Sequence, residues 1–204
     1  MPAMSDSRVI PANDYRRERW KNGLGWTREI ARSHPSEDWD WRLSIAEIEH
    51  SAAFSTFDGV DRELVLLQGQ GVRLAFDDGE AALLTLPGER HRFAGERALR
   101  GELIDGPTHD FNLMWRRDRI GAELLVRPLV GSMLFFTAPG ETWALHLMSG
   151  QAQFDRSTGL PPLWQGDTAL LVGGQTRSRY MLDGGGQLLA MRLTPLAPAQ
   201  EGLQ

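Results

Sequence analysis

Residues 63–76 read ELVLLQGQGVRLAF, two apolar runs joined by Gly69-Gln70-Gly71. Two such runs separated by a glycine turn are typical of a β-hairpin, because glycine adopts the positive φ angles that tight turns need. Further turn signals follow at 77–79 (DDG), 87–88 (PG) and 105–107 (DGP). Their spacing of roughly 8–12 residues, with no amphipathic helical stretch between them, predicts an all-β sandwich or barrel.

The second half of the chain repeats the order of the first. LLQGQ at 66–70 has a counterpart in LMSGQ at 147–151, and ALL at 82–84 has one in ALL at 169–171. Self-similarity at a nearly fixed spacing indicates a duplicated unit. A duplicated small barrel of this kind resembles a bicupin, and Pro87-Gly88-x-x-His91 resembles the second cupin motif. The resemblance implies two closely packed cupin-like barrels of the RmlC-like jelly-roll type. The expected domains are residues 1–117, which carry the functional motifs, and residues 118–204, which complete the scaffold.

Composition excludes several classes of protein. The 204 residues carry a net charge of -5, which argues against a nucleic-acid partner, since counterion release needs a basic face. No cysteine is present, so disulfides and thiolate catalysis are excluded. The N-terminus has no signal-peptide core, and the longest apolar run, 129–138, is too short to span a bilayer. We expect a cytoplasmic protein without a membrane partner.

A polar site is predicted around RWKNGLGWTREI at 19–30. Its two glycines allow the backbone to reverse or to approach a ligand closely, and recognition side chains stand on both sides of them. These side chains include Trp20, Asn22, Thr27 and Glu29, with Gly23 in the turn itself. The alternative is a surface hairpin whose Asn22 and glycines only shape the turn.

The next segment, WDWRLSIAEIE at 39–49, alternates as a strand does. Arg42 and Ser44 share one face, while Trp41 and Leu43 share the other. If the first face lines a cavity, Arg42 and Ser44 offer an anion clamp; if it faces water, they are ordinary exterior residues.

The sequence predicts neither a metal centre nor a cofactor. A cupin metal site needs three or four converging ligands, commonly with a His-x-His pair, and that pair occurs nowhere in the chain. His91 is the only histidine at a plausible ligand position, and packing is the favoured role for it. Ser44 and Ser55 are not in a nucleophile elbow, so nucleophilic catalysis is not indicated either.

Four segments together resemble the HutD/Ves family of bicupin proteins, which is associated in part with histidine utilisation. They are WKNGLGWTREI at 20–30, WRLSIAEI at 41–48, FSTFDGVDRELVLLQG at 54–69 and LIDGPTHDFNLMWRR at 103–117. The resemblance implies a small-molecule binder whose ligand has been proposed to be formylglutamate. The motif positions that it assigns to the ligand are Trp20, Asn22, Gly23, Thr27, Glu29, Arg42, Ser44, Asp61, Arg62, Asp110, Asn112 and Met114.

The chain departs from the family pattern at two places. Leu24 stands where the family has the middle one of three glycines, and Ala52-Ala53 replace a Gly-Pro pair. A side chain at Leu24 could narrow the mouth of the pocket.

Residue chemistry suggests how a carboxylated metabolite would bind. Arg42 or Arg62 could form a bidentate pair with it, while Asn22 and Asn112 supply amide hydrogen bonds. Glu29, Asp61 and Asp110 would orient those arginines or accept a hydrogen bond from a ligand amide. Trp20, Trp26 and Trp41 are candidates for the apolar wall. The same charged residues would also suit an arginine–carboxylate network that only closes the barrel.

These observations lead to a metal-free binding protein that modulates amino-acid catabolism such as histidine utilisation. The first alternative is a cupin enzyme, either metal-dependent or using Glu29 or Asp110 as a general base. The second is a stress-linked protein-interaction protein without a ligand. A homodimer formed through an exposed sheet edge is a geometric possibility.

Overall fold

The computed structural model describes residues 7–197, so the ends of both predicted domains, 1–6 and 198–204, lie outside the described residues. The chain divides into two compact units. One is Asp14–Arg117, and the other contains the described residues before Asp14 and after Arg117. Regular structure within residues 7–197 consists of strands and two short 3-10 helices, η1 (Ala12–Asp14) and η2 (Arg156–Thr158), which confirms the all-β prediction. None of the described helices has the length and apolar character needed to cross a bilayer.

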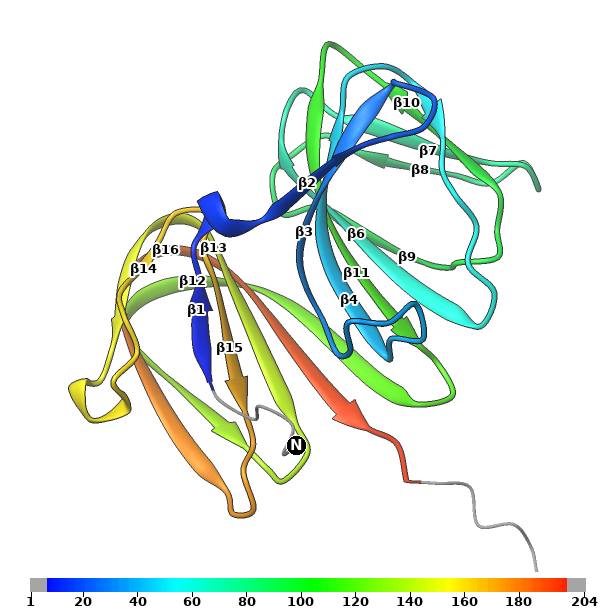
Figure 1. Cartoon of the computed structure of the whole chain (residues 1–204). Helices are drawn as coiled ribbons and strands as arrows, with labels where there is room; N and C mark the ends of the chain where they lie inside the picture. The colour runs from blue at the N-terminus through cyan, green and yellow to red at the C-terminus, as the bar shows by residue number, and fades with distance from the viewer. Residues whose placement is uncertain (1–6, 198–204) are drawn as a thin grey trace, which may run out of the picture. The chain divides into compact units, whose positions relative to one another are not determined.

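Unit Asp14–Arg117 contains two antiparallel sheets, seen in Figure 1. The six-stranded sheet has the order β2 (Arg16–Arg19), β3 (Gly25–Arg32), β4 (Trp41–Ile48), β11 (Thr108–Arg116), β6 (Val60–Gln68) and β9 (Arg90–Ala94). The four-stranded sheet has the order β5 (Ala52–Ala53), β10 (Leu99–Leu103), β7 (Val72–Phe76) and β8 (Ala81–Leu84). A cluster of buried side chains, including Leu64 of β6, Leu74 of β7 and Phe93 of β9, joins them. Each such side chain stabilises the unit by about 1.5–3 kcal/mol on burial.

The prediction of a β-hairpin at 63–76 is wrong. Strand β6 pairs with β11 and β9, whereas β7 pairs with β10 and β8, so the two apolar runs lie in different sheets. The glycine pair that joins them carries the chain from one sheet to the other. Gly69 has φ 109° and Gly71 has φ 126°, values that glycine adopts easily. Here these backbone angles allow the chain to leave one sheet and enter the other. The turn at 77–79 does close a hairpin, between β7 and β8.

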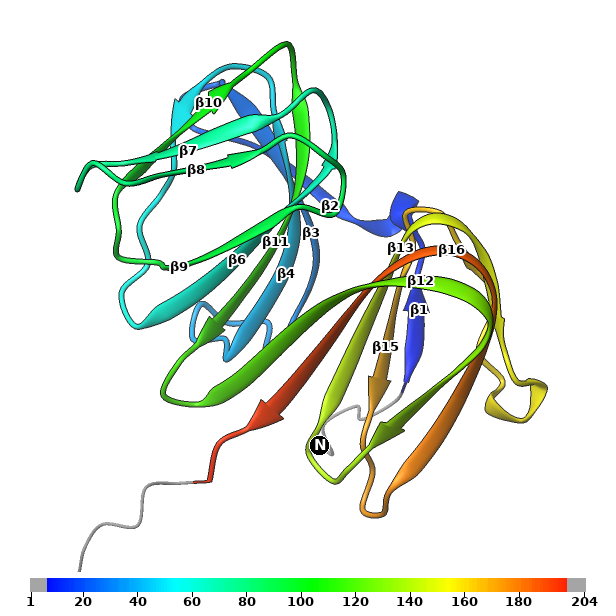
Figure 2. The ribbon, with the colours of Figure 1, turned by 180° about the vertical axis from the view of Figure 1, so that it is seen from behind.

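The other unit contains one six-stranded sheet. Its path is β1 (Arg8–Ile10), β15 (Thr168–Val172), β13 (Thr142–Phe154), β16 (Ser178–Pro195) and β12 (Ile120–Thr137), with β14 (Leu163–Trp164) paired to β13. Strands β12 and β16 are each 18 residues long and bend together along their length (Figure 2). Strand β1 groups with this unit because it pairs with β15, although the predicted domain of residues 1–117 included it.

The repeated sequence segments occupy different structural places. LLQGQ at 66–70 leaves β6 and enters the link between sheets, whereas LMSGQ at 147–151 lies inside β13, which continues to Phe154. ALL at 82–84 belongs to the four-stranded sheet and ALL at 169–171 to the six-stranded sheet of the other unit. The sequence repeat is therefore not matched by a repeat of strand pairing at these positions.

Candidate ligand-binding site

A cavity of about 440 Å³ lies over one face of the six-stranded sheet in unit Asp14–Arg117. Antiparallel pairing places Glu29, Ser44, Asn112 and Leu64 in one row across β3, β4, β11 and β6. The neighbouring row holds Arg42, Met114 and Arg62. Because alternate residues of a strand share a face, these rows present their polar groups on the same side. Of the face predicted at 41–46, Arg42, Ser44 and Ala46 line the cavity, so this face does not simply meet bulk water.

The link between β2 and β3 covers part of the cavity and supplies Trp20, Lys21 and Asn22 to its wall. Trp20 Nε1 donates to Thr27 Oγ1 at 2.9 Å, which fixes the indole against the sheet. The Asn22 side chain accepts a hydrogen bond from the Leu24 amide at 3.0 Å. The segment is thus a hairpin, and part of it also lines the cavity.

Two glycines make this link possible. Gly23 has φ 70°, and a Cβ atom on Gly25 would lie 2.5 Å from the Glu47 carbonyl oxygen. Leu24, the departure from the family pattern, is not among the residues that line the cavity. Its carbonyl accepts hydrogen bonds from the amides of Glu49 and His50, so it serves the link itself.

Arg62 is a buried guanidinium that lines the cavity. It is buried, with only 5% exposure, and among the described residues no carboxylate forms an ion pair with it. Its Nη1 donates to the Ser55 carbonyl at 3.0 Å, while Nε has no partner among the described residues. Desolvation, followed by the nearby charge of Arg42, lowers the pKa of Arg62 to about 10. A buried cation next to a second cation lacks its counter-charge, and an anion would supply it.

Aromatic rings compensate Arg62 in part. Its guanidinium carbon lies 5.6 Å from the ring centroid of Phe54, 5.4 Å from that of Phe57 and 5.1 Å from that of Phe93. Such cation–π contacts stabilise a cation by about 0.5–2 kcal/mol, less than a buried carboxylate pair supplies. Phe54, Phe57 and Trp20 line the cavity and form its apolar wall, with Trp20 and Phe54 in edge contact at 6.2 Å.

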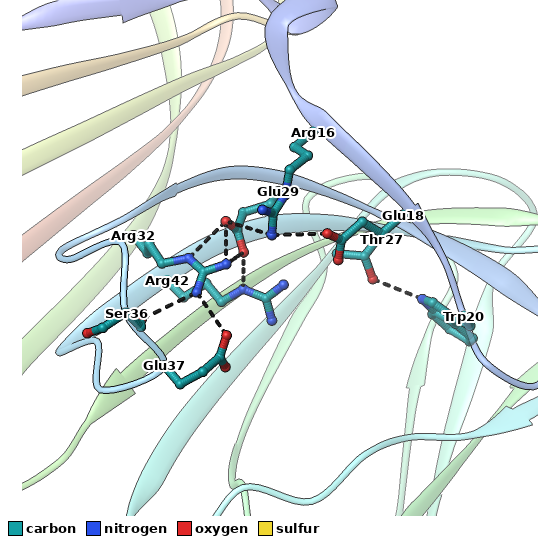
Figure 3. Close-up of polar contacts among 9 residues, drawn as sticks. All are labelled: Arg16, Glu18, Trp20, Thr27, Glu29, Arg32, Ser36, Glu37 and Arg42. Atoms are coloured by element: carbon teal, nitrogen blue, oxygen red, sulfur yellow. Dashed lines mark hydrogen bonds and ion pairs between the residues drawn. The ribbon is translucent and has the colours of Figure 1, made fainter.

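Glu29 holds Arg42 in position (Figure 3). Arg42 Nε donates to Glu29 Oε2 at 2.7 Å, and Arg32 donates to both oxygens of the same carboxylate at 2.9 Å. Burial would raise the pKa of Glu29, but the hydrogen bonds from Arg42 and Arg32 outweigh it and hold the pKa below its usual value. Arg42 lines the cavity, and in Figure 3 its contact with Glu29 is made through Nε.

Asn112 and Ser44 add buried polar side chains to the lining of the cavity. Asn112 is buried, and its Oδ1 has no hydrogen-bond partner among the described residues. Ser44, in the same row, is 2% exposed. Hydrogen-bond donors on a ligand would satisfy Asn112, since an unpaired buried acceptor is unfavourable by about 1–3 kcal/mol.

Asp110 lies one row further along β11 and does not line the cavity. It is fully buried, and Thr108 Oγ1 donates to its Oδ2 at 2.9 Å while Oδ1 has no partner. Burial raises the pKa of Asp110 to about 7, against the smaller effect of the Thr108 hydrogen bond. The expectation that Asp110 orients an arginine is therefore wrong.

Asp61 also lies away from the cavity, because it precedes Arg62 and adjacent strand residues point to opposite faces. Its carboxylate pairs with Arg92 at 2.8 Å and Arg117 at 3.0 Å. The sequence interpretation proposed that Asp61 orients Arg42 or Arg62, but its ion-pair partners are Arg92 and Arg117 instead. Glu29 and Gly23 act through Arg42 and the β2–β3 link, and neither lines the cavity.

His91 packs between aromatic rings. Its ring centroid lies 5.7 Å from that of Phe76 and 6.2 Å from that of Phe93. Within residues 7–197, no group of three histidine or acidic side chains is arranged to hold a metal ion.

Comparisons with known proteins identify the family of the chain. The HutD family profile matches residues 12–190. The chain belongs to the HutD family. A solved structure of HutD from Pseudomonas fluorescens SBW25, in a formate condition, has a TM-score of 0.81 and 30% sequence identity over 94% of this chain and 100% of that chain. This HutD-family protein has the all-β architecture of cupin-fold proteins.

Two relatives match shorter regions. An uncharacterized 21.2 kDa protein in the hutC 3' region of Pseudomonas putida is 42% identical over 59% of this chain and 64% of its own length. Protein Ves of Cronobacter sakazakii is 40% identical over 67% of this chain and 73% of its own length. The resemblance to the HutD/Ves family that the motifs indicated is thereby confirmed.

Several cavity residues of this HutD-family protein were missed by the sequence interpretation. They are Arg19, Lys21, Ala53, Phe54, Ser55, Phe57 and Leu64. Phe54, Ser55 and Phe57 lie in the segment FSTF of a family motif, and none of the three was assigned to the ligand. Conversely, Trp26 and Trp41 were candidates for the apolar wall, and neither lines the cavity. Trp26 instead stacks with Arg17, whose guanidinium carbon lies 4.1 Å from a ring centroid.

Proposed function

We propose that this protein binds a small carboxylated metabolite in the cavity of unit Asp14–Arg117. The observation that carries the proposal is Arg62, a buried guanidinium that lacks a carboxylate partner among the described residues and lies near Arg42. A ligand carboxylate would supply the counter-charge that Arg62 lacks and reduce its repulsion with Arg42, which is already paired with Glu29. Hydrogen bonds between guanidinium and carboxylate groups are charge-assisted and about twice as strong as neutral ones.

The remaining polar groups define the rest of the ligand. Asn112 Oδ1 needs a donor, and Ser44 can donate or accept. An amino-acid metabolite that carries a carboxylate and an N–H group, such as a formylated amino acid, meets these requirements. The apolar wall of Trp20, Phe54 and Phe57 would contact its methylene groups.

We infer a role in modulating amino-acid catabolism, with histidine utilisation as the leading pathway. The position of the P. putida relative in a hutC 3' region supports this assignment. The protein would act in the cytoplasm, without metal, nucleic acid or membrane, by sequestering the metabolite or contacting another protein. The net charge of -5 is consistent with that set of partners. We also infer that the two units are diverged copies of one cupin-like unit. A homodimer formed through an exposed sheet edge is a further proposal.

Isothermal titration calorimetry tests the binding role. We expect N-formyl-L-glutamate or L-glutamate to bind the wild-type protein, and Arg62→Met to weaken binding by at least about tenfold, since a hydrogen bond to a charged group contributes about 1.5–3 kcal/mol. Arg42→Met gives a second, independent measurement. The control is Arg73→Met, which removes an arginine that pairs with Glu102 on the other sheet. Equal affinity in the three variants and the wild type would contradict the proposed site.

A further inference from the structure

A second cavity, of about 300 Å³, lies in the other unit, on strands β13, β14 and β16. Its lining includes Gln151, Gln153, Pro162, Trp164, Asp183 and Gly184. None of these residues belongs to the motifs that identify the family or to the carboxylate site.

Strand register places the polar lining on one face. Trp164 is paired with Gln151 across β14 and β13, and Gln153 is paired with Asp183 across β13 and β16. Paired residues of antiparallel strands point to the same side of a sheet. Ala152, between the two glutamines, is buried and also lines the cavity. The two glutamines and Asp183 are exposed, so the indole, the two amides and the carboxylate share the exposed face of the strands.

Trp164 is exposed, and hydrogen bonds anchor its backbone. Its side chain belongs to a residue with 57% exposure. The Trp164 amide donates to Asp167 Oδ2 at 3.0 Å, and the Asp167 amide donates to the Trp164 carbonyl at 2.9 Å. The preceding residue, Leu163, is fully buried and anchors the strand. The exposed indole beside these polar side chains offers an apolar face on which a ligand ring can pack, and its N–H can serve as a hydrogen-bond donor.

The lining chemistry selects the class of ligand. No cationic side chain is among the described lining residues, which disfavours phosphates and carboxylates. The two glutamine amides both donate and accept hydrogen bonds. The Asp183 carboxylate accepts from Ser132 Oγ at 2.8 Å through Oδ1, which leaves Oδ2 for another donor. An added peptide strand fits poorly, because β14 has only two residues to pair with it.

We propose that this cavity binds the ring of a neutral sugar. The C–H face of the ring packs on the Trp164 indole, and its hydroxyl groups hydrogen-bond with Gln151, Gln153 and Asp183. Hydroxyl groups suit this set because each can donate to the carboxylate and accept from an amide. The proposal is independent of the carboxylate site in the first cavity.

Saturation-transfer difference NMR tests this site with glucose, galactose, N-acetylglucosamine, maltose and cellobiose as probes. We expect saturable transfer to at least one of these sugars at millimolar concentration. Trp164→Ala should weaken that binding at least tenfold, and Gln153→Ala should weaken it as well. Leu83→Ala, which removes another exposed apolar side chain, should leave it unchanged. Absence of transfer to every probe, or equal binding by Trp164→Ala and wild type, would overturn the proposal.

Discussion

At the scale of single residues, the alternation of side chains along a strand decides which residues can line the cavity together. Arg42, Ser44 and Ala46 line it together because alternate residues share a face, and this was predictable from the sequence. The same rule excludes Asp61 from the face of Arg62. The charge state of Asp110, by contrast, depends on burial from every side, and sequence cannot supply that. Its raised pKa leads to a prediction about stability.

We predict that Asp110→Asn flattens the pH dependence of stability between pH about 4 and 7. The pKa of Asp110 is about 7 in the folded protein and near its ordinary 3.8 in the unfolded chain. Between these values the folded state binds more protons, so the free energy of unfolding falls as pH rises, by up to about 4 kcal/mol in total. Asparagine keeps the shape and the Thr108 contact without an ionisable group.

Urea denaturation of the wild type and the variant across this pH range measures the difference. Asp105→Asn, at an exposed position in the turn after β10, serves as the matched control and should leave the wild-type slope intact. A wild-type slope that survives in Asp110→Asn would show that Asp110 titrates normally in the folded protein.

At the scale of elements, the sequence located strands better than their partners. Strands β4, β6, β7 and β11 all occur where alternation or apolar runs indicated them. The hairpin at 63–76 failed because turn chemistry is local, whereas the sheet that a strand joins depends on contacts far along the chain. Gly69 explains the failure physically: a Cβ atom there would lie 2.6 Å from the Pro107 carbonyl oxygen and 2.8 Å from Thr108 Cγ2. The glycine is needed for a close approach to a distant segment.

Gly69→Ala should therefore destabilise the protein more than Gly79→Ala does. Both glycines have positive φ, 109° and 92°, so both variants incur backbone strain of about 1–3 kcal/mol. Only Gly69 has neighbouring atoms that a Cβ would strike, since nothing lies within 4 Å of the Cβ position at Gly79. Urea midpoints of the two variants give the comparison. Equal losses would mean that the link between the sheets relaxes freely around the new methyl group.

At the scale of the whole molecule, the sequence indicated the family and the half of the chain that carries the cavity lined by Arg42 and Arg62. It could not show that the strand pairings around the repeated segments differ between the halves, because similar short strings fit both a strand interior and a link. The two cavities lie in different units and differ in lining: arginines, a lysine and asparagines in one, and glutamines with an acid in the other. They should therefore respond to different ligands.

Amide hydrogen exchange on the whole chain can test whether the two cavities bind different ligands. If N-formyl-L-glutamate or L-glutamate binds as proposed, it should slow amide exchange in the β2–β3 link, whose Trp20, Lys21 and Asn22 line the first cavity. Binding stabilises the states that hold the ligand, so opening of these segments becomes rarer. Segment 151–164 around the second cavity should be unaffected. If either compound slowed exchange at 151–164 and not at 20–24, the carboxylate site would lie in the other unit, and the proposed site would be wrong.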